Sequence, residues 1–396
     1  MAIVLARAGI DVLLLERQPT YRDRVRGEYM APWGVLETRA LGLEDVLRST
    51  HPVDGRYSAT FDELIDPSMA AGARRDNSRF LPDVAGPLCA SHPKSCAALS
   101  EEAVRLGVKL VRGVADVRLQ TGPRPTIRFR NGQQATVRPR LVIGADGRAS
   151  TVRTQSGITL NTCPPTHQVT GLLADGASSW PEDFYTIGVE GDLMFYVFPQ
   201  GTGRVRLYTC HANAQAKRWA GPGGAQRMLD TFAQLRAIPD EMRLDTLTPA
   251  GPCATFSAEQ TWCATPYADG TVLIGDAGGY DNPVDGQGLS LAMSDVRHLS
   301  ELLVNSDDWT ADALRPYGEQ RAERLRRMRR VSTTFAGLMT CFSAAGRARR
   351  ARFYEASRAG RQDVQAALAA IWIGPERLPA DAFTDELHDA LLAVVA

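Results

Sequence analysis

The stretch of residues 272–303 constrains the fold of this chain more than any other part of its sequence. It opens with the apolar run Val272–Ile274, which is typical of a buried strand. Asp276 follows this run, and from Leu289 onward apolar residues recur every three or four positions, as they do along one face of a helix. The pattern therefore predicts a strand, a carboxylate at its end, a glycine turn, and a helix that begins near Gly288.

The residues of this turn suit a ligand that carries hydroxyl groups and negative charge. A carboxylate at a strand end, here Asp276, can accept hydrogen bonds from a sugar-like chain of hydroxyls. The tripeptide Gly286-Gln287-Gly288 leaves little side-chain bulk at the start of the helix, so backbone N–H groups and the positive end of the helix dipole can face an electron-rich group. A lone Gly-Asp or Gly-x-Gly is usually only a turn, but here both occur in one order with Pro283 between them.

A second segment, residues 140–153, has the same organisation. The apolar run 141–143 is followed by a turn that contains Asp146 and Gly147, and then by a short helical segment with Ser150. Together the two segments resemble the DG and GD motifs of the class A flavoprotein monooxygenases, the FAD-dependent aromatic hydroxylase family with the p-hydroxybenzoate hydroxylase fold. The resemblance extends over nearly all of the chain.

The resemblance implies that the chain binds FAD. Asp276 would bond the ribityl chain, the turn that begins at Gly286 would lie beside the pyrimidine edge of the flavin, and the segment around Asp146 would contact the pyrophosphates of FAD and NAD(P)H. The implied cofactor-binding residues are Glu16, Arg26, Asp146, Gly147, Gly275, Asp276, Pro283, Gly286, Gln287 and Gly288.

The N-terminal segment contains part of a dinucleotide-binding unit. Residues 1–9 read as the end of a helix, and 11–15 as a buried parallel strand. Glu16 follows this strand, where a Rossmann unit holds the adenosine ribose, although a solvated glutamate is the alternative. Such a unit should open with a strand and G-x-G-x-x-G, which the sequence does not contain. We therefore expect that roughly 20 or more residues precede this chain, and that the chain as it stands is unstable or binds FAD weakly.

The arginine-rich loop after this strand resembles the family's loop at the flavin edge. Arg26 is the expected FAD contact and Arg24 a second candidate, although both could be surface arginines. Relatives usually begin the next helix with an arginine near the pyrophosphate, whereas this chain has His92, with Lys94 nearby. A histidine before a proline more often has a structural role.

A departure from the family lies next to the expected flavin ring. Many relatives read Gly-Asp-Ala-Ala-His after the strand, whereas this chain has Gly279 in place of the histidine. We expect this loss to leave space and flexibility near the ring and to remove one potential acid/base group, so no catalytic residue is assigned. Candidates for substrate contacts, each more often a core residue, are Tyr185, Phe195, Tyr196, Tyr208, Cys210 and His211.

The expected fold is α/β, with two domains that are discontinuous in sequence. A Rossmann-like FAD-binding domain that lacks its first strand should carry an inserted, mostly antiparallel β-sheet domain for the substrate, followed by C-terminal helices. The expected ranges are 1–55, 85–165 and 257–305 for the FAD-binding domain, 56–84 and 166–256 for the substrate-binding domain, and 306–396 for the helical region. The arginine run 324–330 in that last region is expected to be a solvated helix face.

Composition excludes several other classes of protein. Lys+Arg and Asp+Glu number 45 each, so no net field draws the chain to nucleic acid or to a membrane surface. No apolar run approaches the roughly 20 residues of a membrane helix. The seven cysteines form no C-x-x-C pair and are odd in number, which favours reduced thiols in the cytoplasm, and no metal site is predicted.

The family resemblance also implies a reaction. NAD(P)H would reduce the flavin, O₂ would add to give a hydroperoxyflavin, and one oxygen atom would pass to an organic substrate, an aromatic compound or a secondary metabolite. The protein would orient the substrate and exclude water. The expected activity is that of an FAD-dependent NAD(P)H monooxygenase, with a small organic molecule and O₂ as its partners.

Three alternatives remain open on the sequence. A flavin-dependent halogenase shares the fold, but its W-x-W-x-I-P motif is missing, since no two of the six tryptophans lie two positions apart. A flavin-linked reductase or desaturase of the same superfamily would consume no oxygen in proportion to its product. A non-catalytic remnant that cannot hold FAD is the third.

Overall fold

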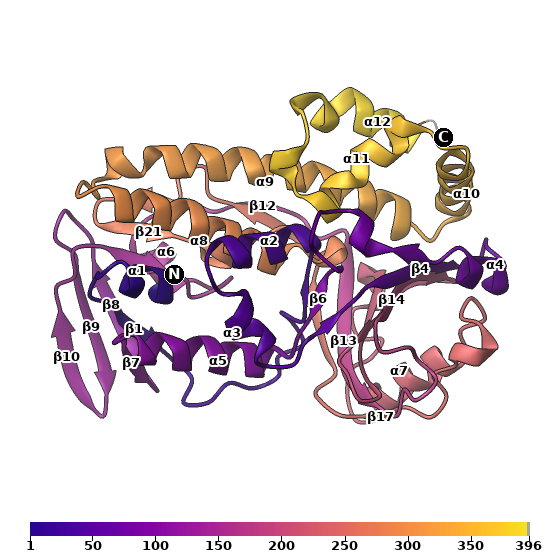
Figure 1. Ribbon diagram of the computed structural model, residues 1–396, viewed down its shortest axis with the longest axis horizontal. Helices are drawn as coiled ribbons and strands as arrows, with labels where there is room; N and C mark the ends of the chain where they lie inside the picture. The colour runs from indigo at the N-terminus through magenta and orange to yellow at the C-terminus, as the bar shows by residue number, and fades with distance from the viewer. Residues whose placement is uncertain (394–396) are drawn as a thin grey trace.

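The computed structural model describes residues 1–393, and Figure 1 shows the arrangement of its helices and strands. The α-helices are α1 Ala2–Arg7, α2 Pro32–Ala40, α3 Glu44–Arg48, α4 Pro67–Gly72, α5 His92–Arg105, α6 Thr151–Gln155, α7 Gly224–Ala233, α8 Gly288–Asn305, α9 Ala311–Met339, α10 Ala344–Arg358, α11 Gln362–Ile373 and α12 Asp385–Ala393. The strands are β1 Leu13–Glu16, β2 Tyr29–Met30, β3 Val53–Asp54, β4 Tyr57–Asp62, β5 Arg75–Asp76, β6 Leu88–Cys89, β7 Lys109–Arg112, β8 Ala115–Gln120, β9 Thr126–Asn131, β10 Gln133–Val137, β11 Val142–Gly144, β12 Asn161–Cys163, β13 His167–Asp175, β14 Phe184–Glu190, β15 Leu193–Pro199, β16 Arg204–Ala212, β17 Thr248–Pro249, β18 Ala254–Ser257, β19 Gln260–Trp262, β20 Tyr267–Ala268 and β21 Thr271–Leu273. The 3₁₀ turns are η1 Asn77–Arg79, η2 Asn213–Gln215, η3 Asp240–Met242, η4 Gly275–Gly278, η5 Pro283–Asp285, η6 Pro375–Arg377 and η7 Ala380–Phe383.

Two pairs of parallel strands form the layer that carries the motif segments. β1 pairs with β7, and β11 pairs with β21. Successive residues of a strand point to opposite sides. Leu14 and Ile143 accordingly share an apolar cluster on one side, while Leu15 and Val142 share another on the opposite side. The two pairs thus lie in one layer, although within residues 1–393 no strand is hydrogen-bonded between β1 and β11.

Helices and a small sheet cover the two sides of this layer. Apolar residues of α1, α5 and α8 form the cluster on one side. The three-stranded antiparallel sheet β10-β9-β8 covers the other side, and Figure 1 shows it at one end of the molecule. The predicted fold class is therefore confirmed: a Rossmann-like α/β unit adjoins a β-sheet domain.

An eight-stranded sheet lies at the other end of the molecule, seen at the lower right of Figure 1. Its strands run in the order β17-β13-β16-β15-β14-β4-β5, with β18 also paired to β13. Neighbouring strands are antiparallel except for β14 and β4, which are parallel. One face packs on α7 around Phe195 and Phe232, which are fully buried, and the opposite face looks toward the motif segments.

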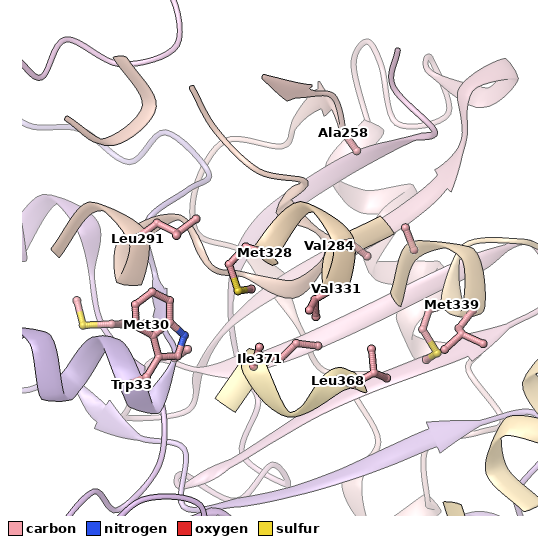
Figure 2. Packing of buried hydrophobic residues seen from close by; sticks show 14 of the residues in the cluster. Met30, Trp33, Ala258, Val284, Leu291, Met328, Val331, Met339, Leu368 and Ile371 are labelled. Carbon is pink, nitrogen blue, oxygen red and sulfur yellow. The ribbon is translucent and has the colours of Figure 1, made fainter. Parts of the chain in front are cut away.

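The long helix α9 is buried along much of its length. It contacts α8, α10, α11 and α12, and Figure 2 shows its residues Met328 and Val331 packed among apolar side chains from α8 and α11. The expectation of a solvated basic face was therefore wrong for Arg324, which is 2% exposed and ion-paired with Asp295. Arg326 does lie on the exposed side, because the cover of α8 and α11 reaches only one side of the helix.

The described residues contain no membrane-spanning helix and no metal cluster. Within residues 1–393 no helix is long and apolar enough to cross a membrane. In the same residues, no group of three or more His, Cys, Asp and Glu side chains is placed to hold a metal ion.

Gly188 of β14 provides a test of the large sheet. A Cβ at this position would lie 1.8 Å from the backbone oxygen of Phe61 and 2.3 Å from the ring of Phe195. Gly188→Ala should therefore lower the free energy of unfolding by about 1–3 kcal/mol or more, because the backbone at Phe61 and the Phe195 ring would both have to move away from the new methyl group. Chemical denaturation measures the change. Gly72→Ala in α4 is the matched control, because its Cβ would meet nothing within 4 Å; equal losses in the two variants would contradict this account.

Candidate flavin and substrate site

A single cavity of about 2810 Å³ joins the motif segments to the large sheet. Sites for drug-sized ligands usually measure roughly 300–1,000 Å³, so this cavity has room for a dinucleotide together with a second molecule. Nine of the ten cofactor-binding residues expected from the sequence line it. The fold therefore brings together segments that lie up to 272 residues apart, from Glu16 to Gly288.

The loop after β21 ends in a helix start that is open to the cavity. η5 precedes Gly286, whose φ of +72° and contact with the Tyr29 ring exclude any larger residue, since a Cβ would lie 2.7 Å from that ring. α8 then begins at Gly288, where a Cβ would meet nothing within 4 Å. Among the described residues no side chain caps this helix, so its first N–H groups can face an anionic or electron-rich ligand.

Gln287 has a different place from its two glycine neighbours. Its side-chain amide donates to the backbone oxygens of Asp285, at 2.7 Å, and Ile371, at 3.2 Å. Its carbonyl oxygen accepts a hydrogen bond from the indole of Trp33 at 2.8 Å. Gln287 does not line the cavity. Its side chain therefore links the loop to α2 and α11. Gln287 stays a predicted flavin contact, and such a contact would have to come from its backbone.

Asp276 lies where three segments predicted from the sequence meet: the loop after β21, the arginine-rich loop with Arg26, and the DG turn that precedes Arg148. Burial raises the pKa of its carboxyl group, while the charges of Arg148 and Arg26 act in the opposite direction. Arg148 follows the DG turn and lies with its guanidinium 3.7 Å from the centre of the Tyr280 ring. The sequence reasoning missed Arg148, although its position directly after Gly147 was the available signal.

Asp146 serves the protein's own backbone. One carboxylate oxygen accepts from the Ser150 hydroxyl, and the other accepts from the N–H groups of Thr151, at 2.7 Å, and Val152, at 3.1 Å. These bonds fix the start of α6 at the rim of the cavity. The role of Asp146 in pyrophosphate binding stays a prediction, and the turn that it shapes includes Gly147, which has a φ of +79°.

Glu16 stands at the end of β1 and lines the cavity, as the Rossmann pattern predicts. Its Oε1 accepts the backbone N–H of Gln18 at 2.7 Å. Within the described residues its second oxygen accepts no hydrogen bond, which leaves an acceptor for a ribose hydroxyl.

The arginine loop has a strained backbone. Val25, between Arg24 and Arg26, is buried and has a φ of +58°, a conformation that β-branched residues avoid. Gly27 lies so close to His92 that a Cβ would be 2.6 Å from its Nδ1. Burial, and then the charge of Arg26, lower the pKa of His92. Both arginines line the cavity, and strained backbone concentrates at functional sites.

A buried ion pair ties this loop to the large sheet. Arg206 of β16 lies 2.5 Å from Asp23 and 3.1 Å from Glu28, which flank Arg26 in the loop. The Tyr208 hydroxyl donates to Glu28 at 2.5 Å. Burial raises the pKa of Glu28, and the charge of Arg206 opposes that rise. Nothing in the local sequence signalled Arg206, because it lies about 180 residues from its partners.

Arg321 of α9 clamps the loop that begins at Gly275. Its guanidinium is 2% exposed and donates to the backbone oxygens of Gly275, at 2.9 Å, and Gly278, at 2.7 Å. It also bonds Asp295 of α8 at 2.8 Å, and Asp295 in turn accepts the N–H of Gly275 at 2.8 Å. Arg321 and Asp295 therefore both hold the backbone of this loop in place.

The expectation of free space at Gly279 was wrong. A Cβ there would lie 2.5 Å from the backbone of Thr261 and Trp262, and the residue has a φ of +111°. The loop is therefore packed closely against β19 at this position.

An aromatic wall closes the sheet end of the cavity. Alternation along β15 and β16 turns Tyr196 and Tyr208 toward the cavity, while Phe195 and His211 point to the opposite face of the sheet. Of the other substrate-contact candidates, Tyr185 and Cys210 also line the cavity. The rings of Tyr29, Tyr185, Tyr196, Phe198 and Tyr208 lie in mutual contact, with centroids 5.0–6.2 Å apart.

Comparison with known proteins agrees with this geometry. The family described as FAD binding domain matches residues 1–332. A rifampicin monooxygenase of Streptomyces venezuelae is 28% identical over 321 residues, which are 77% of this chain and 62% of that protein. A kynurenine 3-monooxygenase of Salinispora arenicola is 28% identical, over 78% of this chain and 71% of that protein. Curated reductases also occur among the relatives.

The solved structure of p-nitrophenol 4-monooxygenase PnpA from Pseudomonas putida DLL-E4 has the same fold, with a TM-score of 0.77 at 19% identity over 95% of both chains. The match of the family over more than four fifths of the chain is decisive. This chain belongs to the family described as FAD binding domain.

Proposed function

We propose that this protein inserts one oxygen atom of O₂ into a small organic substrate, with FAD as its cofactor and NAD(P)H as the reductant. The observation that carries the proposal is one cavity lined both by Asp276 and the open start of α8 and by the aromatic wall around Tyr196. A flavin held at the start of α8 would lie near a substrate on the aromatic wall.

The residues present fit an FAD molecule. The uncapped start of α8 at Gly288 offers N–H donors and space that a side chain would fill. Asp276 offers acceptors for ribityl hydroxyls, Glu16 offers one for the ribose, and Arg26 and Arg148 offer positive charge to phosphate. When bound, the flavin supplies the redox chemistry that protein side chains lack.

The chain itself orients the reactants and excludes water. The clamp by Arg321 fixes the position of the flavin-binding loop, and the aromatic wall presents flat apolar faces to an aromatic substrate. A dry, pre-shaped cavity favours transfer of oxygen to the substrate over its loss to solvent.

A flavin-linked reductase is the second candidate, because reductases occur among the relatives. Oxygen uptake distinguishes the two activities. A monooxygenase consumes one O₂ for each product molecule, whereas a reductase forms its product without oxygen. An oxygen electrode, run with NADH or NADPH and a panel of phenols, would decide between them, and product formed under anaerobic conditions would contradict our proposal.

Asp276 should be needed for flavin affinity. Asp276→Ala removes the carboxylate that would accept hydrogen bonds from the ribityl hydroxyls, and such bonds to a charged group are worth about 1.5–3 kcal/mol, or roughly 10–100-fold in Kd. Titration with FAD, followed by visible absorbance, measures both chains. Asp192→Ala is the control, because Asp192 lies outside the cavity with its side chain 53% exposed. If the unaltered chain takes up no FAD, the proposed function fails.

Arg321 should be needed for stability and for the shape of the loop. Arg321→Ala leaves Asp295 buried without one of its partners and should lower the free energy of unfolding by about 3–5 kcal/mol. It should also weaken the affinity for flavin. Arg326→Ala is the matched control on the same helix; its pair with Glu323 is exposed and should change stability by less than about 1 kcal/mol. A tolerated loss of Arg321 would show that the loop keeps its shape without the clamp.

A further inference from the structure

The parallel strand layer has an opening between β1 and β11. β1 is paired on one edge with β7, and β11 is paired on one edge with β21. Within residues 1–393 no strand is paired with the other edge of either one. We call the opening between these two free edges the strand slot. It is part of the large cavity, because residues 12–16 and 141–143 line that cavity.

The free edge of β1 presents backbone groups to the slot. The backbone oxygens of Val12 and Glu16 accept N–H groups from the segment 109–114, which contains β7. The backbone groups of successive residues in a strand point to alternate edges. The N–H and C=O groups of Leu13 and Leu15 therefore point away from β7 and into the slot.

The free edge of β11 does the same from the opposite direction. The N–H of Val142 donates to the backbone oxygen of Gly270 at 2.9 Å, and the oxygen of Gly144 accepts the N–H of Ile274 at 3.0 Å. These bonds lie on the side of β21, so the N–H and C=O groups of Ile143 point into the slot. Backbone groups at two facing edges thus lack a partner strand within the described residues, and such groups are costly to leave unpaired.

Apolar side chains close the two remaining sides of the slot. One side is formed by helices α1 and α8, and the other by strand β9. The wall residues that line the cavity are Leu5, Val296 and Leu303 on the first side and Ile127 and Phe129 on the second. A strand in the slot would therefore have apolar contacts on both of its faces, as the central strand of a parallel sheet has.

These features select a peptide strand over other ligands. A hydrocarbon could fill the space between the walls, but it has no donors or acceptors for the two free edges. A nucleotide has such groups, but its charged phosphates would lie against apolar walls. An extended peptide offers N–H and C=O groups along both edges and side chains on both faces. Residues 12–15 and 141–143 carry no charge, so the matching segment is uncharged and apolar.

A second copy of this chain has no suitable strand to offer. Within residues 1–393 its long apolar strands, such as β15, are already paired on both edges. Its edge strands carry charged or polar residues, as Lys109 and Arg112 in β7 and Gln133 and Gln134 in β10 illustrate. The matching strand therefore comes from another polypeptide.

We propose that the strand slot binds one extended, uncharged apolar segment of another polypeptide, which pairs with β1 and β11 at the same time. β1 has four residues and β11 three, so a segment of about four or five residues spans them. The proposal rests on the proposed function in one respect only. Glu16 and Asp146 follow the two strands, so a segment that fixes both strands should also tighten the binding of FAD.

Hydrogen–deuterium exchange of the whole chain tests the slot without flavin. The probe is a synthetic peptide of five valine and isoleucine residues between terminal lysines. At saturating peptide, exchange of the backbone N–H groups of Leu13, Leu15 and Ile143 should slow roughly tenfold or more, because these groups become hydrogen-bonded. Exchange in the large sheet should not change.

A peptide with proline at its centre is the control for this experiment, because proline has no N–H and cannot pair within a sheet. Equal slowing by both peptides would mean that apolar contact alone fills the slot, and would overturn the proposal. Slowing in only one of the two strands, or in neither, overturns it as well. A dimer that protects the same N–H groups without peptide would assign the slot to a second copy and contradict the proposal.

A charge placed at the slot should weaken the peptide. Leu13 is 38% exposed, so Leu13→Lys costs the folded chain little, but peptide binding would then bring a cation against apolar side chains. The Kd of the valine and isoleucine peptide, measured by calorimetry, should rise several-fold. Val104→Lys is the matched control, because Val104 is 50% exposed and lies outside the cavity. Equal peptide affinity of the two variants would overturn the assignment.

Titration with FAD separates the strand slot from the proposed function. Protection by the peptide without any uptake of FAD means that the proposed function fails and the slot stands. Uptake of FAD without protection by the peptide means the reverse. Where both occur, the peptide should lower the Kd for FAD, and an unchanged or raised Kd contradicts the link between the slot and the residues that follow its two strands.

Discussion

The ion pair between Asp295 and Arg321 is the interaction on which the site depends. Both side chains are almost fully buried, and together they occupy the N–H of Gly275 and the backbone oxygens of Gly275 and Gly278. A loop rich in glycine has high conformational entropy in the unfolded chain, so it needs such fixed partners to keep one shape. Because Asp295 belongs to α8 and Arg321 to α9, the packing of these two helices is transmitted directly to the loop that positions Asp276.

The sequence allowed the prediction of elements whose residues are neighbours along the chain. The strand, loop and helix of residues 272–303 appear as β21, the two 3₁₀ turns and α8. These features follow from local rules of turn chemistry and periodicity. The expected limits of the two domains, by contrast, stay predictions, although the large sheet does take its strands from residues 57–76 and 167–257.

Contacts between distant segments could not be predicted. The buried Arg324 bonds Asp295 of α8 and Glu376 of η6, which lie 29 and 52 residues away, and the partners of Arg206 lie in a loop far upstream. The sequence identifies the arginines of α9 as charged residues, but only the packing of α8 and α11 determines which of them are buried. The same limit applied to β15 and β16, where alternation predicts two faces and the fold alone decides that Tyr196, not Phe195, meets the cavity.

The size of the shared cavity has a consequence for the life of the protein in a cell. Its walls come from the parallel strand layer, the large sheet and the C-terminal helices, so whatever fills it contacts all three. A ligand that binds only the folded state adds stability in proportion to the logarithm of its concentration, about 2.7 kcal/mol at one hundred times its Kd. Proteases remove chains that unfold, so the supply of cofactor would set the amount of this protein as well as its activity.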